Sequence, residues 1–196
     1  MFNQDTIIAK ATGVGSSAIC LFRLSGINSI EMVSQCFHTK SKKKLINQKS
    51  HTIHLGTLQY EGVVLDEVLV SVFRAPHSYT GENVVEISCH GSNYIQEEVL
   101  RLFISKGAQP AKPGEFTLRA FLNKKMDLSQ AEAVADLIVS ESEAAHQVAM
   151  NQMRGGYTTE IAQLRQKLLD FASLITLELD FAEEDVNFAD RTALTK

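Results

Sequence analysis

The sequence is poor in cysteine and has no long hydrophobic run. Its three cysteines, Cys20, Cys36 and Cys89, are odd in number and include no C-x-x-C pair, which argues against both a disulfide framework and a zinc knuckle. The longest apolar stretches fall well short of the roughly 18 residues that a membrane span needs. The beginning of the sequence, MFNQDTIIAK, lacks the basic and then apolar pattern of a secretory signal. We therefore expect a cytoplasmic protein that does not enter a membrane.

An excess of positive charge is also missing. The 196 residues carry a formal net charge of −4, so the chain alone has no basic surplus for electrostatic capture of nucleic acid. The sequence contains no G-x-x-x-x-G-K-[ST] motif, which is the phosphate-binding loop of many nucleotide hydrolases. We expect no tight nucleotide binding by these residues. The content of 44% hydrophobic and 21% charged residues is typical of a globular protein.

Turn-forming residues are concentrated in the first part of the chain. All three prolines and nine of the eleven glycines precede residue 118, and the net charge is +1 up to that residue but −5 beyond it. This change predicts an α+β domain over residues 1–118 and an acidic, helical segment over residues 119–196.

Residue periodicity predicts the elements of both parts. Runs typical of strands cover residues 5–12, 18–24, 52–60, 63–73 and 84–89, and helical stripes begin near residues 29 and 95. Ser129-x-x-Glu132 fits a capping box, and helical spacing then continues to Gly155-Gly156 and resumes over residues 161–179. We predict two long antiparallel helices within residues 127–179, with apolar faces that the pair alone cannot bury.

One glycine-rich loop invites an oxidoreductase interpretation. Gly13-x-Gly15-x-x-Ala18 matches the dinucleotide fingerprint, but that fingerprint requires a helix immediately afterwards, because the pyrophosphate lies on its N-terminus. The residues that follow are typical of a strand. A simple glycine-rich turn is therefore favoured. A helix directly after Gly15 would instead favour a dinucleotide-binding oxidoreductase.

Some polar residues lie in unusual surroundings. Arg23 and Glu86 each interrupt an apolar strand, where an isolated charge is costly. They either form a structural ion pair or anchor a polar ligand. Cys89 and His90 are adjacent on a strand and so point to opposite faces, which argues against a thiol–imidazole pair. The acidic run over residues 178–185 favours a solvated surface over a metal site.

Several motifs together resemble one known family. They are Asp5-Thr6-Ile7 with Ala11-Thr12, Arg23-x-Ser25-Gly26, Ser78-Tyr79-Thr80-Gly81-Glu82-Asn83, Glu86-Ile87-Ser88-Cys89-His90-Gly91, Pro113-Gly114-Glu115-Phe116-Thr117, and a long stretch that comprises Arg119-Ala120-Phe121-Leu122-Asn123 and Lys125-Met126-Asp127-Leu128-Ser129-Gln130-Ala131-Glu132-Ala133. The whole chain resembles the N-terminal part of the MnmE (TrmE) family of tRNA-modification GTPases.

The resemblance implies a fold and a set of partners. The first domain of this family is similar to the folate-binding module of the glycine-cleavage aminomethyltransferase, forms homodimers and binds a tetrahydrofolate derivative such as 5-formyltetrahydrofolate. A central helical domain follows, with an inserted G domain that uses GTP, Mg and K. With the FAD-dependent partner MnmG, the complex installs the 5-carboxymethylaminomethyl group on the wobble uridine of certain tRNAs.

The resemblance also implies which residues contact folate. The family's contacts correspond to Arg23, Glu86 and Lys125 in this sequence. A carboxylate such as Glu86 can accept hydrogen bonds from a pterin, and the two cations can hold the carbonyl or the anionic glutamyl end. No catalytic or metal-binding residue is expected within these residues.

The sequence differs from the family pattern in one loop and in length. The loop 13–17 lacks the proline and arginine common in the family, and the chain stops at Lys196 before any G domain. We therefore expect this piece not to hydrolyse GTP and to be either a deliberately shortened chain or the leading fragment of a longer protein. The alternative to a folate-binding module is a structural dimerisation scaffold without a working folate site.

Overall fold

The chain folds as two compact units. The computed structural model describes residues 5–39 and 44–180, and the units are Met1–Asp127 and Leu128–Lys196. The predicted boundary at residue 118 is wrong, because it would cut helix α3 (Glu115–Leu122), which belongs to the first unit. Prolines and glycines end before α3 does, so the change in composition precedes the change in structure.

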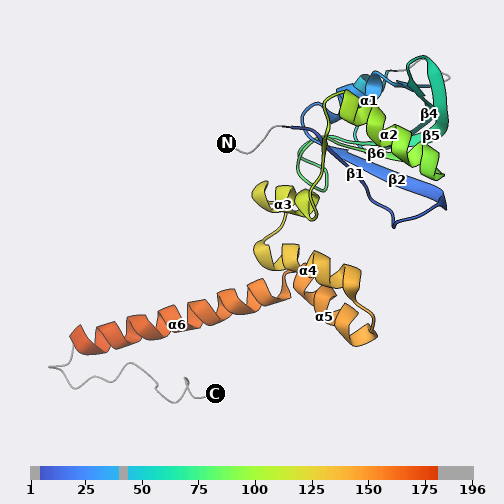
Figure 1. Cartoon of the computed structure of the whole chain (residues 1–196). Coiled ribbons are helices and arrows are strands. Elements are labelled where there is room, and N and C mark those ends of the chain that lie inside the picture. Colours follow the sequence, from blue (N-terminus) through green and yellow to red (C-terminus); the bar gives the residue numbers. More distant parts are fainter. Residues whose placement is uncertain (1–4, 40–43, 181–196) are drawn as a thin grey trace. The chain divides into compact units, whose positions relative to one another are not determined.

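The first unit is built on one mixed sheet of seven strands, in the order β3-β4-β5-β6-β2-β1-β7 (Figure 1). The strands are β1 (Ile7–Lys10), β2 (Ser17–Ser25), β3 (Phe37–His38), β4 (Thr52–Tyr60), β5 (Val63–Phe73), β6 (Val84–Gly91) and β7 (Gln109–Pro110). The short β7 pairs in parallel with β1, and the other ladders are antiparallel. The predicted α+β class is therefore confirmed at the level of a mixed sheet with helices.

The hairpin of β4 and β5 follows directly from its turn residues. Glu61 and Gly62 have φ angles of 51° and 82°, which is the left-handed backbone of a two-residue type I′ turn. Tyr60 and Val63 pair across this turn. The predicted strands over residues 52–60 and 63–73 thus have the observed bounds.

Two helices cover one face of the sheet. They are α1 (Ser29–Ser34) and α2 (Asn93–Ser105), and the Ser92 side chain caps α2 by accepting a hydrogen bond from the Ile95 backbone N–H. The predicted stripe of α2 packs inward, with Val99, Leu102 and Phe103 fully buried. These helices enclose the core against the inward side chains of β2, β5 and β6, which are Cys20, Phe22, Leu24, Val68, Val70, Val72, Val85, Ile87 and Cys89.

The opposite face of the sheet carries the alternate side chains. Leu55 of β4 pairs with Leu69 of β5, and the two are 54% and 45% exposed. Leu69 in turn lies beside Ser88 of β6, and Ser88 beside Leu21 of β2. The open-face row thus consists of Leu55, Leu69, Ser88 and Leu21. Because Arg23 and Glu86 are also outward on β2 and β6, two of the three predicted site residues share this face.

The helical unit differs from the prediction of two long helices. It contains α4 (Leu128–Val139), α5 (Glu143–Met153) and α6 (Gly156–Asp180). The predicted first helix breaks at Ser140–Ser142, because the Ser142 side chain accepts a hydrogen bond from the Ala145 backbone N–H and so starts a new helix. Ser129 lies inside α4 and does not cap it. The break lets α4 and α5 pack together, while apolar residues of α6 such as Ile161 and Leu164 stay exposed.

The structure decides the remaining sequence alternatives. Strand β2 begins at Ser17, directly after the glycine-rich loop, so no helix is present to complete a dinucleotide site, and the oxidoreductase interpretation is excluded. Cys89 is buried while His90 is exposed, as adjacent strand positions require. Of the acidic run, residues 181–185 lie outside the described residues. No helix within residues 5–39 and 44–180 is long and apolar enough to span a membrane.

The buried thiols generate a test of the fold. Cys20, Cys36 and Cys89 are free and buried, and burial raises the pKa of Cys36 to about 11 and that of Cys89 to about 12. Since the thiolate is the reactive form, we expect no cysteine to react with Ellman's reagent within minutes at pH 8. The same assay in guanidinium chloride should release three equivalents. One rapidly reacting thiol in the native protein would contradict this burial.

Candidate functional site

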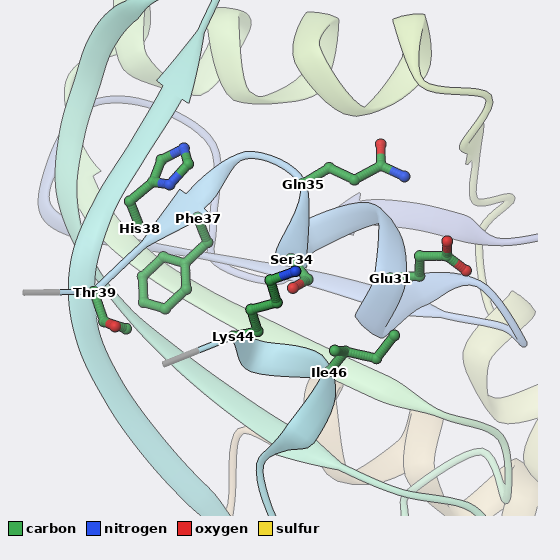
Figure 2. Close-up of a pocket in the computed structure, with 8 residues that line it drawn as sticks. All are labelled: Glu31, Ser34, Gln35, Phe37, His38, Thr39, Lys44 and Ile46. Carbon is green, nitrogen blue, oxygen red and sulfur yellow. The ribbon is translucent and has the colours of Figure 1, made fainter. Parts of the chain in front are cut away.

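One described cavity lies away from the predicted site residues. It measures about 640 Å³, is located beside α1 and the 3₁₀ helix η1 (Leu45–Asn47), and is shown in Figure 2. Its lining residues are Glu31, Ser34, Gln35, Phe37, His38, Thr39, Lys44 and Ile46. None of Arg23, Glu86 and Lys125 lines it. The candidate site is therefore the charged pair on the open face of the sheet.

Arg23 and Glu86 form a two-donor ion pair. The register of β2 and β6 places the two residues opposite each other. Nε and Nη2 of Arg23 lie 2.8 Å and 2.7 Å from the same oxygen, Oε1 of Glu86. The side chains are 26% and 21% exposed, so one side of the pair is open to solvent.

The pair does not use all of its hydrogen-bonding capacity. Among the described residues, neither Nη1 of Arg23 nor Oε2 of Glu86 has a hydrogen-bond partner. A donor and an acceptor thus remain on neighbouring groups. The sequence left open whether Arg23 and Glu86 form an ion pair or anchor a ligand. The structure shows the ion pair, and the free donor and acceptor are also compatible with anchoring a ligand.

Two aromatic rings lie against the Arg23 guanidinium. Its central carbon Cζ is 5.1 Å from the ring centre of Tyr79 and 5.7 Å from that of Phe116, within the range of cation–π contacts. The Tyr79 hydroxyl shares a 2.9 Å hydrogen bond with Thr117 Oγ1. Sequence reasoning missed both aromatic residues as site members, although each lies in a motif that carries the family resemblance. An aromatic residue inside a short polar motif was the available signal.

Lys125 lies close to the same loop but does not join the pair. Its Nζ donates a 3.1 Å hydrogen bond to the backbone carbonyl of Pro76, and the side chain is exposed. Gly81 has a φ of 78°, and a Cβ there would come within 3.3 Å of the Lys125 side chain. Since the loop 74–83 carries both Pro76 and Tyr79, it connects Lys125 to Arg23. The structure therefore brings two of the three predicted residues into contact, and the third to the same loop.

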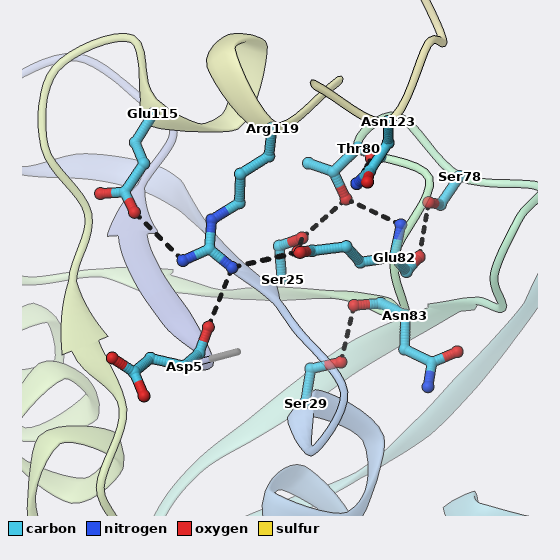
Figure 3. A network of polar contacts seen from close by, with 10 residues as sticks. All are labelled: Asp5, Ser25, Ser29, Ser78, Thr80, Glu82, Asn83, Glu115, Arg119 and Asn123. Carbon is cyan, nitrogen blue, oxygen red and sulfur yellow. Dashed lines mark hydrogen bonds and ion pairs between the residues drawn. The ribbon is translucent and has the colours of Figure 1, made fainter. Parts of the chain in front are cut away.

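Arg119 is a residue of α3 whose side chain binds the loop 74–83 (Figure 3). The residue is 9% exposed. Its Nη1 donates to the Asp5 carbonyl at 2.9 Å and to both carboxylate oxygens of Glu82 at 3.2 Å and 3.3 Å. Its Nη2 donates to Glu115 Oε1 at 3.1 Å. One buried guanidinium thus joins the chain before β1, the loop 74–83 and α3.

Hydroxyl groups extend the network to the sheet. Ser25 Oγ lies 2.7 Å from Glu82 Oε2 and 2.7 Å from Thr80 Oγ1. The Asn123 amide donates to the Thr80 carbonyl at 2.7 Å, and the Ser29 hydroxyl donates to the Asn83 carbonyl at 2.8 Å. These contacts hold the end of the loop from Thr80 to Asn83, directly after Tyr79.

The network also stabilises the ionised form of Glu115. Burial by itself raises the pKa of this carboxyl, but the Lys112 backbone N–H and the Arg119 guanidinium donate to it, and their combined effect lowers the pKa below its usual value. Glu115 is therefore charged at neutral pH. Arg119 accordingly has two carboxylates, Glu82 and Glu115, as ion-pair partners.

Loss of the Arg119 guanidinium should destabilise the first unit. Arg119→Leu leaves two partly buried carboxylates without their cation, so we expect a loss of about 3 kcal/mol in the free energy of unfolding. Arg101→Leu is the matched control, because Arg101 pairs with Glu98 on α2 but is 64% exposed, and it should cost less than about 1 kcal/mol. Urea titration followed by circular dichroism measures both. Equal losses of unfolding free energy in the two variants would show that the Arg119 contacts stabilise the fold no more than an exposed ion pair does.

Comparison with known proteins identifies the family of the chain. Residues 6–125 match the family model described as the GTP-binding protein TrmE N-terminus, and residues 128–196 match the model described as the MnmE helical domain. The boundary between the two matches agrees with the boundary between the compact units.

Curated relatives give the same result. The tRNA modification GTPase MnmE of Flavobacterium psychrophilum is 61% identical over 192 residues, which cover 98% of this chain and 42% of the relative. The proteins of the same name from Christiangramia forsetii and Bacteroides thetaiotaomicron are 62% and 58% identical, over 96% and 99% of this chain and 40% and 42% of each relative. The chain thus spans about two fifths of the length of these relatives. With both of its units matched in order, the chain belongs to the MnmE (TrmE) family.

Proposed function

We propose that the first unit of this chain binds a reduced folate, 5-formyl- or methylenetetrahydrofolate, as a one-carbon donor for modification of tRNA. The observation that carries the proposal is the partly exposed Arg23–Glu86 pair, which retains one donor and one acceptor. Family membership supports the same role, because the folate contacts implied by the family resemblance correspond to these two residues and to Lys125.

The pair fits the chemistry of a pterin. The pyrimidine edge of a pterin presents N–H groups beside a carbonyl oxygen. Glu86 Oε2 can accept from the N–H groups, and Arg23 Nη1 can donate to the carbonyl. Because both protein groups are already fixed by their mutual ion pair, little side-chain entropy is lost when the ligand binds.

Lys125 suits the other end of a folate. Its ammonium group is exposed and lies at the loop 74–83, so it can reach an anionic glutamyl group without being desolvated. A solvated cation of this kind contributes less binding free energy than a buried one. We therefore assign to Lys125 the weaker, charge-based contact.

The wider reaction involves parts beyond this chain. We propose that the full-length protein hydrolyses GTP with Mg and K in a separate G domain and acts in the cytoplasm with the FAD-dependent protein MnmG. In that complex the folate supplies one carbon to the 5-carboxymethylaminomethyl group of the wobble uridine. The names of the relatives, tRNA modification GTPase, support the reaction class. The 196 residues of this chain contain no phosphate-binding loop of the G-x-x-x-x-G-K-[ST] type.

The open face of the sheet supports the proposed homodimer. Leu55 and Leu69 are exposed next to each other, on the face that α1 and α2 do not cover. Burial of such side chains against a second copy stabilises a dimer at about 25 cal/mol per Å² of apolar surface removed from water. Because Arg23 and Glu86 lie on the same face, a partner there would also reduce solvent access to the folate site.

Substitution of the three residues separates folate binding from a structural role. Glu86→Ala should cost about 1.5–3 kcal/mol of folate binding free energy, roughly ten- to a hundredfold in affinity, because a charged acceptor is lost. Lys125→Ala should weaken binding less. Titration calorimetry with 5-formyltetrahydrofolate measures both, and Glu98→Ala, which removes an ion-paired carboxylate on α2, is the matched control.

The structural alternative gives different results. A dimerisation scaffold without a folate site predicts no binding by the wild-type chain. An ion pair with a purely structural role predicts that Arg23→Ala and Glu86→Ala lower the melting temperature and that folate affinity does not depend on Lys125.

The open-face row provides a test of assembly. A chain with both Leu55→Glu and Leu69→Glu should be monomeric in light scattering at tens of micromolar, while the wild-type chain should be dimeric, because buried like charges oppose association. Ile104→Glu is the control, since Ile104 is 44% exposed on α2, which covers the other face of the sheet. A dimer that persists in the double variant would place the interface elsewhere.

A further inference from the structure

We infer that Tyr79 and Phe116 form an aromatic clamp that binds the planar ring of the ligand, so that the site is selective for a flat nitrogen heterocycle. The inference rests on the proposed folate-binding function and adds two binding residues to it. Neither residue is among the three folate contacts that the family resemblance implies.

A ligand that binds the free groups of the pair shares the plane of the Arg23 guanidinium. Arg23 has a flat guanidinium whose N–H groups all point outward in that plane. A heterocycle that accepts a hydrogen bond from Nη1 and donates one to Glu86 Oε2 lies approximately in the same plane. Tyr79 and Phe116, with ring centres 5.1 Å and 5.7 Å from Arg23 Cζ, lie against the guanidinium. They therefore also border the space that such a ring enters.

The clamp is held in place before the ligand arrives. The Tyr79 hydroxyl and Thr117 Oγ1 are 2.9 Å apart, and Thr117 follows Phe116 on α3. One side-chain hydrogen bond thus joins Tyr79 to the residue that follows Phe116. Arg119 joins the same two segments through Glu82 and Glu115. A preformed clamp loses less conformational entropy on binding than two mobile rings would.

The clamp is accessible from solvent. Tyr79 and Phe116 are both half-buried, and the Arg23 and Glu86 side chains are 26% and 21% exposed. Here partly exposed rings border a partly exposed ion pair with an unused donor and acceptor. A flat ring that fills this place covers apolar surface and satisfies both polar groups at once.

Leucine and conservative aromatic substitutions test the clamp. The whole chain is titrated with 5-formyltetrahydrofolate by calorimetry, and the melting temperature of each variant is measured. Tyr79→Leu and Phe116→Leu should each weaken binding about three- to tenfold, the usual contribution of one aromatic contact. Tyr79→Phe and Phe116→Tyr keep a ring and should bind within about twofold of the wild type. Tyr94→Leu is the control, because Tyr94 is 67% exposed on α2, and it should leave affinity unchanged.

The outcomes separate the clamp from the folate proposal itself. If the wild-type chain does not bind 5-formyltetrahydrofolate, the proposed function fails, and this inference fails with it. If the wild type binds and the leucine variants bind equally well, the inference alone is overturned. It is also overturned if Tyr79→Phe loses as much affinity as Tyr79→Leu, because the hydroxyl contact with Thr117, and not the ring, would then account for the effect.

Discussion

The first unit depends on one buried cation. Arg119 lies on α3, outside the sheet, yet its guanidinium contacts the Asp5 carbonyl, Glu82 and Glu115. A buried guanidinium has to be surrounded by acceptors, because an unpaired charge at this depth would destabilise the fold by several kcal/mol. Satisfying Arg119 therefore fixes the chain before β1, the loop 74–83 and α3 relative to one another.

That constraint separates two kinds of polar residue on the first unit. Ser25, Thr80 and Glu82 direct their side chains toward one another, so their role is to hold the loop. Arg23 and Glu86 lie nearby on β2 and β6 and keep an unused donor and acceptor. The network thus provides the rigid frame, and the partly open pair provides the chemistry. A binding site of this kind combines preorganisation with residual hydrogen-bonding capacity.

The helical unit buries fewer of its apolar side chains than the first unit does. The α4–α5 pair buries Ala133 and Ala149, whereas α6 keeps Ile161, Leu164 and Leu168 at least 50% exposed. Such a face has the helical spacing of a packing surface. The sequence therefore predicted the amphipathic character of this segment correctly, but the Ser142 cap divides its first half, and periodicity alone does not reveal a break of three residues.

Local patterns determined the elements, and tertiary contacts determined the site. Alternation and turn residues were sufficient for the β4–β5 hairpin, and helical spacing was sufficient for α2, because both depend on neighbours close in sequence. The family resemblance identified Arg23, Glu86 and Lys125 as candidate site residues. Only the register of β2 against β6 shows that Arg23 and Glu86 are neighbours. The position of Tyr79 and Phe116 beside Arg23, and the assignment of α3 to the first unit, depend on Arg119 contacts across tens of residues. Long-range pairing of charges follows from the packed fold and leaves no periodic trace in the sequence, which is why the structure alone decided it.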